Sequence, residues 1–365
     1  MDSNLIDILK TIEDFRSPRG VRYPLWLILL LAILGALSGC KGYKALEEFC
    51  VRHYGALCEC LGIAVKRLPS DSTFRQIFQR LDFAFLIEAF YQWTMGTCEQ
   101  PKGEWFAVDG KSLGSTVTHA SESYQNFVSL VSVYSHQRGI VVALKQFENK
   151  VDSEITVVRT LLESLNLKEA VFTCDALHCQ KKTLAIIVES GNDYLVGVKA
   201  NQPKLMNAIE QLAQEQMPID THEDSERTRD RVTHRKVQVF NDVTGIDPDW
   251  PKVQSLIRVK RWGTRSGKPF ESTSYFISSL SCDASRFAQG IRGHRDIENR
   301  LHWVKDVVLI QDAAPFKVYN PATNWSIIRT IVLNLFRGWG YASLTAGQRF
   351  LAHDVPKLFS LLTTN

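Results

Sequence analysis

One uncharged run restricts the possible folds of this chain more than any other feature. Residues 23–40, YPLWLILLLAILGALSGC, are about as long as the shortest helix that crosses a bilayer. A proline, two glycines and a serine interrupt the run, Lys41 follows it directly, and no second apolar stretch of this length occurs. Its upstream residues include several acids and do not match the basic start of a signal peptide: Asp2, Asp7, Glu13 and Asp14. We therefore expect a buried helix opened by Pro24, with membrane insertion as the alternative.

Composition supports a folded cytoplasmic protein with no membrane association. Hydrophobic residues make up 45% of the 365 residues and charged residues 22%, which excludes disorder as the default. The 43 basic and 39 acidic residues nearly cancel, so nucleic-acid binding must be argued from where charges lie. The eight cysteines show no repeated pair spacing, which favours reduced thiols. A zinc site is an alternative for one group, although its spacing fits no common finger: Cys50, His53, Cys58 and Cys60.

The pattern of apolar residues divides the chain into a helical part and a mixed part. Residues 1–98 carry helical periodicity almost throughout, including 43–61 and 72–95, and residues 99–104 have the proline and glycine of a linker. From Trp105 onward, strands and helices alternate. We expect strands at 105–108, 127–135, 139–148, 170–174 and 194–199, and helices at 155–165, 180–190 and from 203. This order predicts an α/β fold with a mixed sheet covered by helices over 104–365.

A basic β segment interrupts the mixed part at about residues 220–282. Strands are expected at 231–240, 255–262 and 272–280, followed by helices at 285–308 and 325–339. Eleven lysines and arginines lie from Arg227 to Lys268, and about half of them are close to Trp262 in the sequence. Such a surface could bind DNA or stack an unpaired base, and we predict contacts from Arg231, Arg235, Lys236 and Trp262. The alternative is that these charges only protect edge strands from aggregation.

Two aspartates directly follow predicted strands. Asp109 ends WFAVD and Asp175 ends VFTCD, so both side chains should emerge at an end of the sheet. Oxygen ligands of this kind suit Mg²⁺, which retains several waters when it binds to carboxylates. The alternative is that each aspartate caps the turn or helix that follows it.

A third carboxylate, Glu298, lies in the segment GHRDIENRLHWVKDV. With α-helical periodicity, His294, Glu298, His302 and Lys305 share one face, which without a partner site would be a solvated surface. Together with the two aspartates, Glu298 would complete a site for two metal ions, as in many phosphoryl-transfer enzymes.

At this point the sequence resembles the bacterial insertion-sequence DDE transposases, in particular the H-repeat-associated group. The similarity covers nearly the whole chain and rests on the order and spacing of several motifs: RYPLWLILLLAILGALSG, PSDSTFRQIFQRLD, FAVDGKSL, KVDSEITVVRTLLESLNL, VFTCDALHCQKKT, DYLVGVKANQP, YFISSL and GHRDIENRLHWVKDV. It implies an all-helical N-terminal domain at 1–98 and a ribonuclease-H-like catalytic domain at 104–365 with a β insertion. It also implies that Asp109, Asp175 and Glu298 bind Mg²⁺ or Mn²⁺.

The resemblance further implies a reaction and partners. The implied reaction is DNA strand cleavage at terminal inverted repeats and strand transfer into target DNA. The expected assembly on DNA is a homodimer. Several polar residues near the metal ligands are candidates for DNA contact: Lys111, Lys199, Asn201, His302 and Lys305. The family pattern changes at Leu113 and Gly114, at Arg295 and from Gln311 onward. These departures leave two alternatives open, a DNA-binding relative without catalysis and a nuclease of the same fold.

Overall fold

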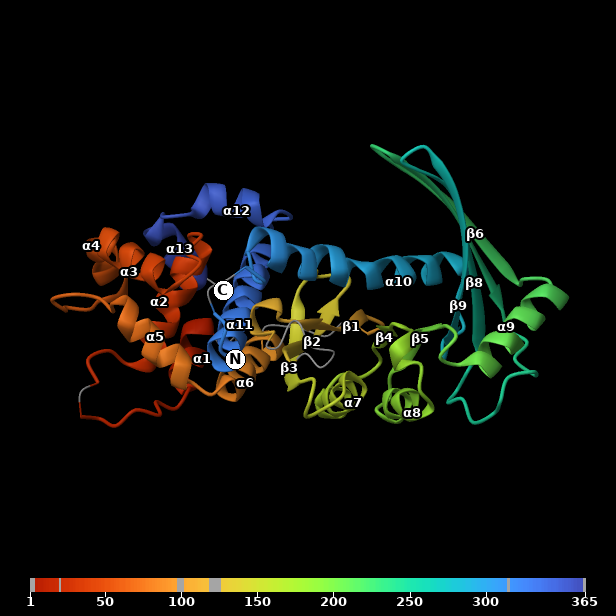
Figure 1. Ribbon diagram of the computed structural model, residues 1–365, viewed down its shortest axis with the longest axis horizontal. Helices are drawn as coiled ribbons and strands as arrows, with labels where there is room; N and C mark the ends of the chain where they lie inside the picture. Colours follow the sequence, from red (N-terminus) through yellow and green to blue (C-terminus); the bar gives the residue numbers. More distant parts are fainter. Residues whose placement is uncertain (1–3, 20, 97–101, 118–125, 314–315, 364–365) are drawn as a thin grey trace.

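A nine-stranded mixed sheet runs through the middle of the molecule, with the strand order β3-β2-β1-β4-β5-β9-β8-β7-β6 (Figure 1). The computed structural model describes residues 4–19, 21–96, 102–117, 126–313 and 316–363. The strands within these residues are β1 Trp105–Ser112, β2 Val128–Ser135, β3 Val141–Glu148, β4 Val171–Cys174, β5 Asp193–Val198, β6 Asp220–Thr228, β7 Arg231–Phe240, β8 Ser255–Arg265 and β9 Lys268–Ser278. Each predicted strand is therefore present, and β6 is an additional one.

The first five strands form the centre of the sheet. β1 pairs antiparallel with β2, and β2 pairs antiparallel with β3. β4 and β5 run parallel to β1. The helix α7 (Glu154–Ser164) connects β3 to β4, which lies on the other side of β1. Their near-continuous apolar sequences match burial on both faces.

Helices cover the two faces of this centre. On one face α7, α8 (Lys181–Glu189) and α9 (Pro203–Glu215) pack on alternate strand residues, including Phe106, Val108 and Phe172. On the other face α10 (Ala284–Asp296) packs through Phe287 on Trp105 and Val171. Trp105 and Phe106 thus point in opposite directions, as neighbours in a strand must.

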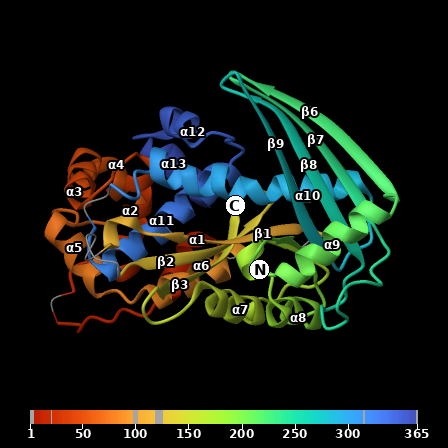
Figure 2. The same cartoon turned by 45° about the vertical axis from the view of Figure 1, so that its right-hand side comes forward.

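The basic β segment continues the same sheet. β9 pairs antiparallel with β5, and β8, β7 and β6 follow in turn as antiparallel neighbours. These four strands are longer than the central ones, and they curve as a blade past α10 (Figures 1 and 2). The four strands β6 to β9 together form this blade.

The N-terminal residues form helices, as predicted. They are α1 Leu5–Thr11, α2 Leu25–Leu37, α3 Tyr43–Arg52, α4 Tyr54–Leu61, α5 Asp71–Arg80 and α6 Phe83–Gly96. Two stretches with continuous helical periodicity each contain two helices, which break at His53 and at Leu81, where the backbone leaves the helical conformation. The predicted linker 99–104 and the boundary at residue 98 lie mostly outside the described residues.

The C-terminal helices join the N-terminal ones in one helical body. These are α11 Tyr319–Gly338, α12 Leu344–Leu351 and α13 Val355–Thr363. One continuous apolar core contains residues of α1 to α6, of α11 to α13 and of the sheet (Figure 1). The side chains of α2 are almost all buried in this core, which confirms that the uncharged run is an interior helix. No described helix is long and apolar enough to span a membrane.

The cysteine predictions can be checked in part. Seven cysteines lie in the described ranges, and all are free thiols. Across the described ranges, no three side chains of the types His, Cys, Asp and Glu are grouped as ligands of a metal ion. The cysteines and histidine around His53 therefore form no preassembled zinc site.

Candidate active site at the ends of two parallel strands

Asp109 and Asp175 lie next to each other at one end of the central sheet. Val108 pairs with Cys174 in the parallel register of β1 and β4, and the two aspartates are the next residues along these strands. Trp105 and Val171, which precede them by four residues, contact α10. Strand alternation therefore directs both carboxyl groups toward the α10 side of the sheet.

Burial and neighbouring carboxylates change the acidity of Asp109. Burial, followed by the charges of Glu154, Asp175 and Glu298, raises the pKa of Asp109 to about 7. A hydrogen bond from the Gly110 amide to the Asp109 carboxylate acts in the opposite direction. The three predicted carboxylates therefore interact electrostatically, although they lie far apart in sequence.

Glu154 is a fourth carboxylate, which the sequence analysis missed. It is the first residue of α7, whose N-terminus is capped by the Ser153 hydroxyl. A Cβ atom on Gly110 would lie only 2.5 Å from the Glu154 carboxylate, so this carboxylate lies directly against the backbone of β1. Nε2 of His178 lies 3.1 Å from Oε1 of Glu154. The acidic residue directly before the predicted helix 155–165 was the available signal, because an acid in the first turn is favoured by the helix dipole.

Glu298 lies on the helix that continues from α10, and here the helix is wound differently from the prediction. Residues Ile297–His302 and Val304–Val308 have π-helical winding, with hydrogen bonds that span five residues instead of four. Glu298 is exposed, whereas Lys305 is only 2% exposed and donates a hydrogen bond of 3.0 Å to the Thr330 hydroxyl. The prediction that both share one face is wrong, because seven residues of a π-helix do not make two turns. Lys305 does not reach the surface on which DNA could lie.

His302 was predicted to contact DNA but contacts Asp109 instead. Its Nδ1 atom is 3.6 Å from Oδ2 of Asp109. Burial, together with the charges of Lys305 and Lys111, lowers the pKa of His302 to about 3. This shift favours the neutral imidazole, so the contact with the aspartate is not an ion pair at neutral pH.

Lys111 links β1 to the π-helical residues Val304–Val308 and to the residues that follow them. Its ammonium donates a hydrogen bond of 2.6 Å to Asp306 and lies 3.9 Å from a carboxylate oxygen of Asp312. Asp312 also accepts a hydrogen bond from the Gly114 amide. Gly114 and Asp312 belong to two of the departures from the family pattern, and they contact each other.

The residues after β5 hold the loop that follows Asp175. Lys199 is exposed beyond the strand end. Asn201 donates to the Ala176 carbonyl, and Gln202 donates to the Cys179 carbonyl. Asp175 itself accepts a hydrogen bond of 2.9 Å from the Leu177 amide. One of its oxygens therefore caps a turn, as the alternative interpretation expected, and the other is left for the site.

The predicted DNA-contact residues of the blade lie on two different faces. Arg235 pairs with Arg261 across β7 and β8, on the face that turns toward α10. Arg231 lies on this inner face by the same alternation, whereas Lys236 and Trp262 lie on the outer face. Trp262 stacks on His234 and is 38% exposed. The sequence predicted one surface, but the register of the strands separates these residues onto two faces.

The carboxylates at the strand ends suit a cation. Several negative groups surround Asp109, and the histidine that contacts it is neutral. A divalent ion with oxygen ligands would offset this charge as effectively as a proton does. Within the described ranges, however, no three of these side chains are already placed around a common ion.

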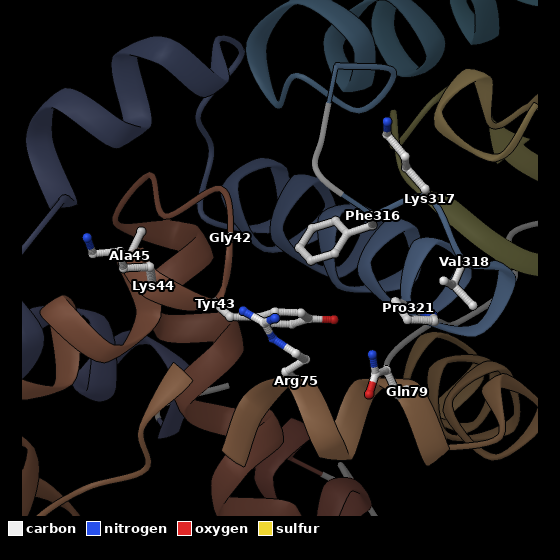
Figure 3. Close-up of a pocket in the computed structure, with 10 residues that line it drawn as sticks. All are labelled: Gly42, Tyr43, Lys44, Ala45, Arg75, Gln79, Phe316, Lys317, Val318 and Pro321. Atoms are coloured by element: carbon white, nitrogen blue, oxygen red, sulfur yellow. The ribbon is translucent and has the colours of Figure 1, made fainter. Parts of the chain in front are cut away.

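A cavity of about 430 Å³ in the helical body is a separate feature (Figure 3). Its lining comes from the starts of α3 and α11 and from α5, and includes Tyr43, Arg75, Gln79 and Lys317. It has no acidic lining residue, and none of the four carboxylates contributes to it. The strand ends, where acidic groups meet, are therefore the better candidate for chemistry.

The chain thus has a mixed α/β sheet in which Asp109 and Asp175 lie on and directly after two adjacent parallel strands. Residues 94–335 match the family model described as the transposase DDE domain, and residues 6–94 match the domain associated with it. The chain belongs to this family of DDE transposases.

Two relatives from Escherichia coli carry transposase in their names. YncI of strain O157:H7 is 30% identical over 92% of this chain and 87% of its own length. The H repeat-associated YhhI of strain K12 is 28% identical, with 91% and 89% covered.

Proposed function

We propose that the chain catalyses metal-dependent cleavage and transfer of DNA strands at the ends of an insertion sequence. The observation that carries this proposal is the arrangement of Asp109 and Asp175 on adjacent parallel strands, facing the helix that bears Glu298. The central strand order β3-β2-β1-β4-β5 supports a ribonuclease-H-like catalytic core over residues 104–365. Residues 1–98 would be the transposase-associated domain, and the blade would be the β insertion.

Asp109, Asp175 and Glu298 would hold Mg²⁺ or Mn²⁺, with Glu154 beside them. When bound, two such ions lower the pKa of an attacking water or 3′ hydroxyl and stabilise the leaving oxygen. The chain itself supplies position and charge. The His302 imidazole lies against the Asp109 carboxylate, and the turn capped by Asp175 fixes that residue beyond the end of β4.

The blade and α10 would hold the DNA. Arginines of the inner face lie toward the site, so a duplex with terminal inverted repeats could reach the carboxylates between the two elements. Target DNA would follow the same path, and a homodimer would bring two ends together.

Nicking of DNA by purified protein tests the proposal. The substrate would be a supercoiled plasmid that carries the DNA flanking the gene, with Mg²⁺, Mn²⁺ or EDTA. We expect nicking with either metal and none with EDTA, and Asp109→Asn should lose it while retaining DNA binding. An Asp109→Asn protein that nicks at the wild-type rate would sink the assignment of the carboxylates.

A DNA-binding relative without catalysis is a second candidate, because Lys305 is buried and Lys111 is engaged by Asp306. Against it, two departures from the family pattern meet in the hydrogen bond between Gly114 and Asp312. A Cβ atom on residue 114 would lie only 3.1 Å from the Asp312 side chain, so the two changed positions fit each other. A wild type that binds its flanking DNA but never nicks with either metal would favour this second candidate.

A further inference from the structure

The inner face of the blade changes in character along its length. Near the sheet centre, Val237, Val239 and Val259 pack against α10. Farther along the same strands, the inner positions are taken by Arg235 opposite Arg261 and by Arg231 opposite Arg265. Along the inner face, apolar packing thus gives way to a row of guanidinium groups. The blade itself extends past α10 (Figure 2).

The acidic residues of this face neutralise only part of the row. Arg235 lies 2.9 Å from Asp224 and 2.5 Å from Glu226. Arg292 of α10 also approaches Asp224, at 2.9 Å. Both carboxylates are therefore already engaged by these two arginines.

Arg261 and Arg295 remain without such a partner. Within the described ranges, neither forms an ion pair, and Nε of Arg261 is buried without a hydrogen-bond partner. Burial, followed by the charges of Arg261 and Arg235, lowers the pKa of Arg295 to about 10. Burial and the charges of Arg235 and Arg231 also lower the pKa of Arg261. Both groups are half-buried. The contacts around them place them near each other, because Arg235, which is opposite Arg261, shares Asp224 with Arg292, and Arg292 lies on α10 three residues before Arg295.

Their location connects them to the candidate active site. Arg295 lies on α10 three residues before Glu298, close enough for the glutamate charge to oppose the lowering of its pKa. Residues three apart on a helix are neighbours on its surface. An anion bound by Arg295 would therefore lie beside the carboxylate cluster.

We propose that Arg261 and Arg295 together bind one backbone phosphate of the DNA strand that enters between the blade and α10. This inference rests on the proposed function and names a contact within it. Guanidinium groups match phosphate geometry with paired hydrogen bonds, and a phosphodiester would offset the repulsion between the two cations. Without DNA, holding two unpaired cations side by side costs stability.

The matched variants are Arg261→Gln, Arg295→Gln, the double variant and Lys260→Gln. Lys260 precedes Arg261 in β8 and lies on the outer face, so its substitution removes the same charge from the opposite side. The probe is a fluorescein-labelled 30-base-pair duplex of random sequence, titrated at several NaCl concentrations without metal. Thermal melting is measured on the same proteins without DNA.

We expect each arginine variant to melt at a higher temperature than the wild type and to bind the duplex more weakly. If the two arginines share one phosphate, the slope of log affinity against log salt should fall by about 0.9 in the double variant. If each arginine bound its own phosphate, the slope would fall by about 1.8. Lys260→Gln should match the wild type in melting temperature. Arginine variants with the wild-type salt slope, or with lower melting temperatures, would overturn the subsite.

Failure of the subsite and failure of the proposed function are distinguishable. A wild type that nicks plasmid while both arginine variants bind the duplex normally contradicts only the subsite. A wild type that binds through both arginines but never nicks supports the subsite and contradicts the catalytic proposal.

Discussion

Nδ1 of His302 lies 3.6 Å from Oδ2 of Asp109, yet the two groups do not form an ion pair. The imidazole is neutral because burial lowers its pKa to about 3, while burial and other carboxylates raise the pKa of Asp109 to about 7. When Asp109 loses its proton, the negative charge is therefore not compensated by this histidine. A cation bound at the site would compensate it.

This uncompensated charge makes stability depend on pH. Between the ordinary pKa of 3.8 and about 7, the folded state keeps a proton that the unfolded state has lost, so wild-type stability falls as pH rises through this window. Asp109→Asn removes the effect. Without metal, we expect the variant to melt above the wild type at pH 8, with a difference that shrinks toward pH 4. Calorimetric melting from pH 4 to 8 measures it, with the exposed Asp249→Asn as control, and a difference independent of pH would contradict the interpretation.

Glu154→Gln should shift the pH dependence of the site. The Glu154 charge raises the pKa of Asp109, so its removal should let Asp109 ionise at lower pH. We expect the pH at which nicking or Mn²⁺ binding is half-maximal to fall, while affinity for the duplex stays unchanged. Glu163→Gln is the matched control, because Glu163 lies exposed near the other end of α7. An unchanged midpoint in Glu154→Gln would show that this carboxylate does not act on the site.

The sequence placed Asp175 correctly, directly after a buried strand that ends at Cys174. The strand end predicted before Asp109 was wrong, because β1 continues to Ser112 through its pairing with β2, and this pairing is not visible in the local apolar pattern. Glu154 could not be found in this way. Its carboxylate lies against Gly110 because α7 begins beside β1, and this packing is not visible in the local sequence.

Long-range packing also decided the other differences. Lys305 was placed by α-helical periodicity, which the π-helical winding of its segment breaks. The separation of Arg235 from Lys236 depends on which face of the blade meets α10, and α10 follows the blade in sequence. The union of α2 with α11 in one core depends on contacts between the two ends of the chain.

Lys305 should make the stability of the wild type rise with pH, whereas Asp109 makes it fall, and Lys305→Met should remove this rise. Burial, followed by the charges of Arg329 and Lys111, lowers the pKa of Lys305 from 10.5 to about 7. From pH 7 to 10.5 the unfolded state binds a proton that the folded state lacks, so wild-type stability rises with pH over this window. The methionine variant lacks this gain. We expect its stability relative to the wild type to be greatest near pH 6.5 and to decline by pH 10. Urea unfolding at both values measures this, with the exposed Lys182→Met as control, and parallel curves for wild type and variant would refute it.

The close approach of α10 to the sheet gives the last prediction. A Cβ atom on Gly290 would lie 2.1 Å from the Trp105 ring, and one on Gly293 would lie 2.2 Å from the His136 ring. Gly290→Ala must therefore push α10 away from β1, and overpacking of this kind costs about 1 to 3 kcal/mol. Gly338→Ala is the control, because nothing lies within 4 Å of that position at the end of α11. Alanine there should instead raise stability by up to about 1 kcal/mol.

Since α10 leads directly into the segment that carries Glu298, a displaced helix should also lower the nicking rate of Gly290→Ala under conditions where the protein remains folded. A Gly290→Ala protein with wild-type stability and nicking rate would mean that α10 is not held against Trp105 as described.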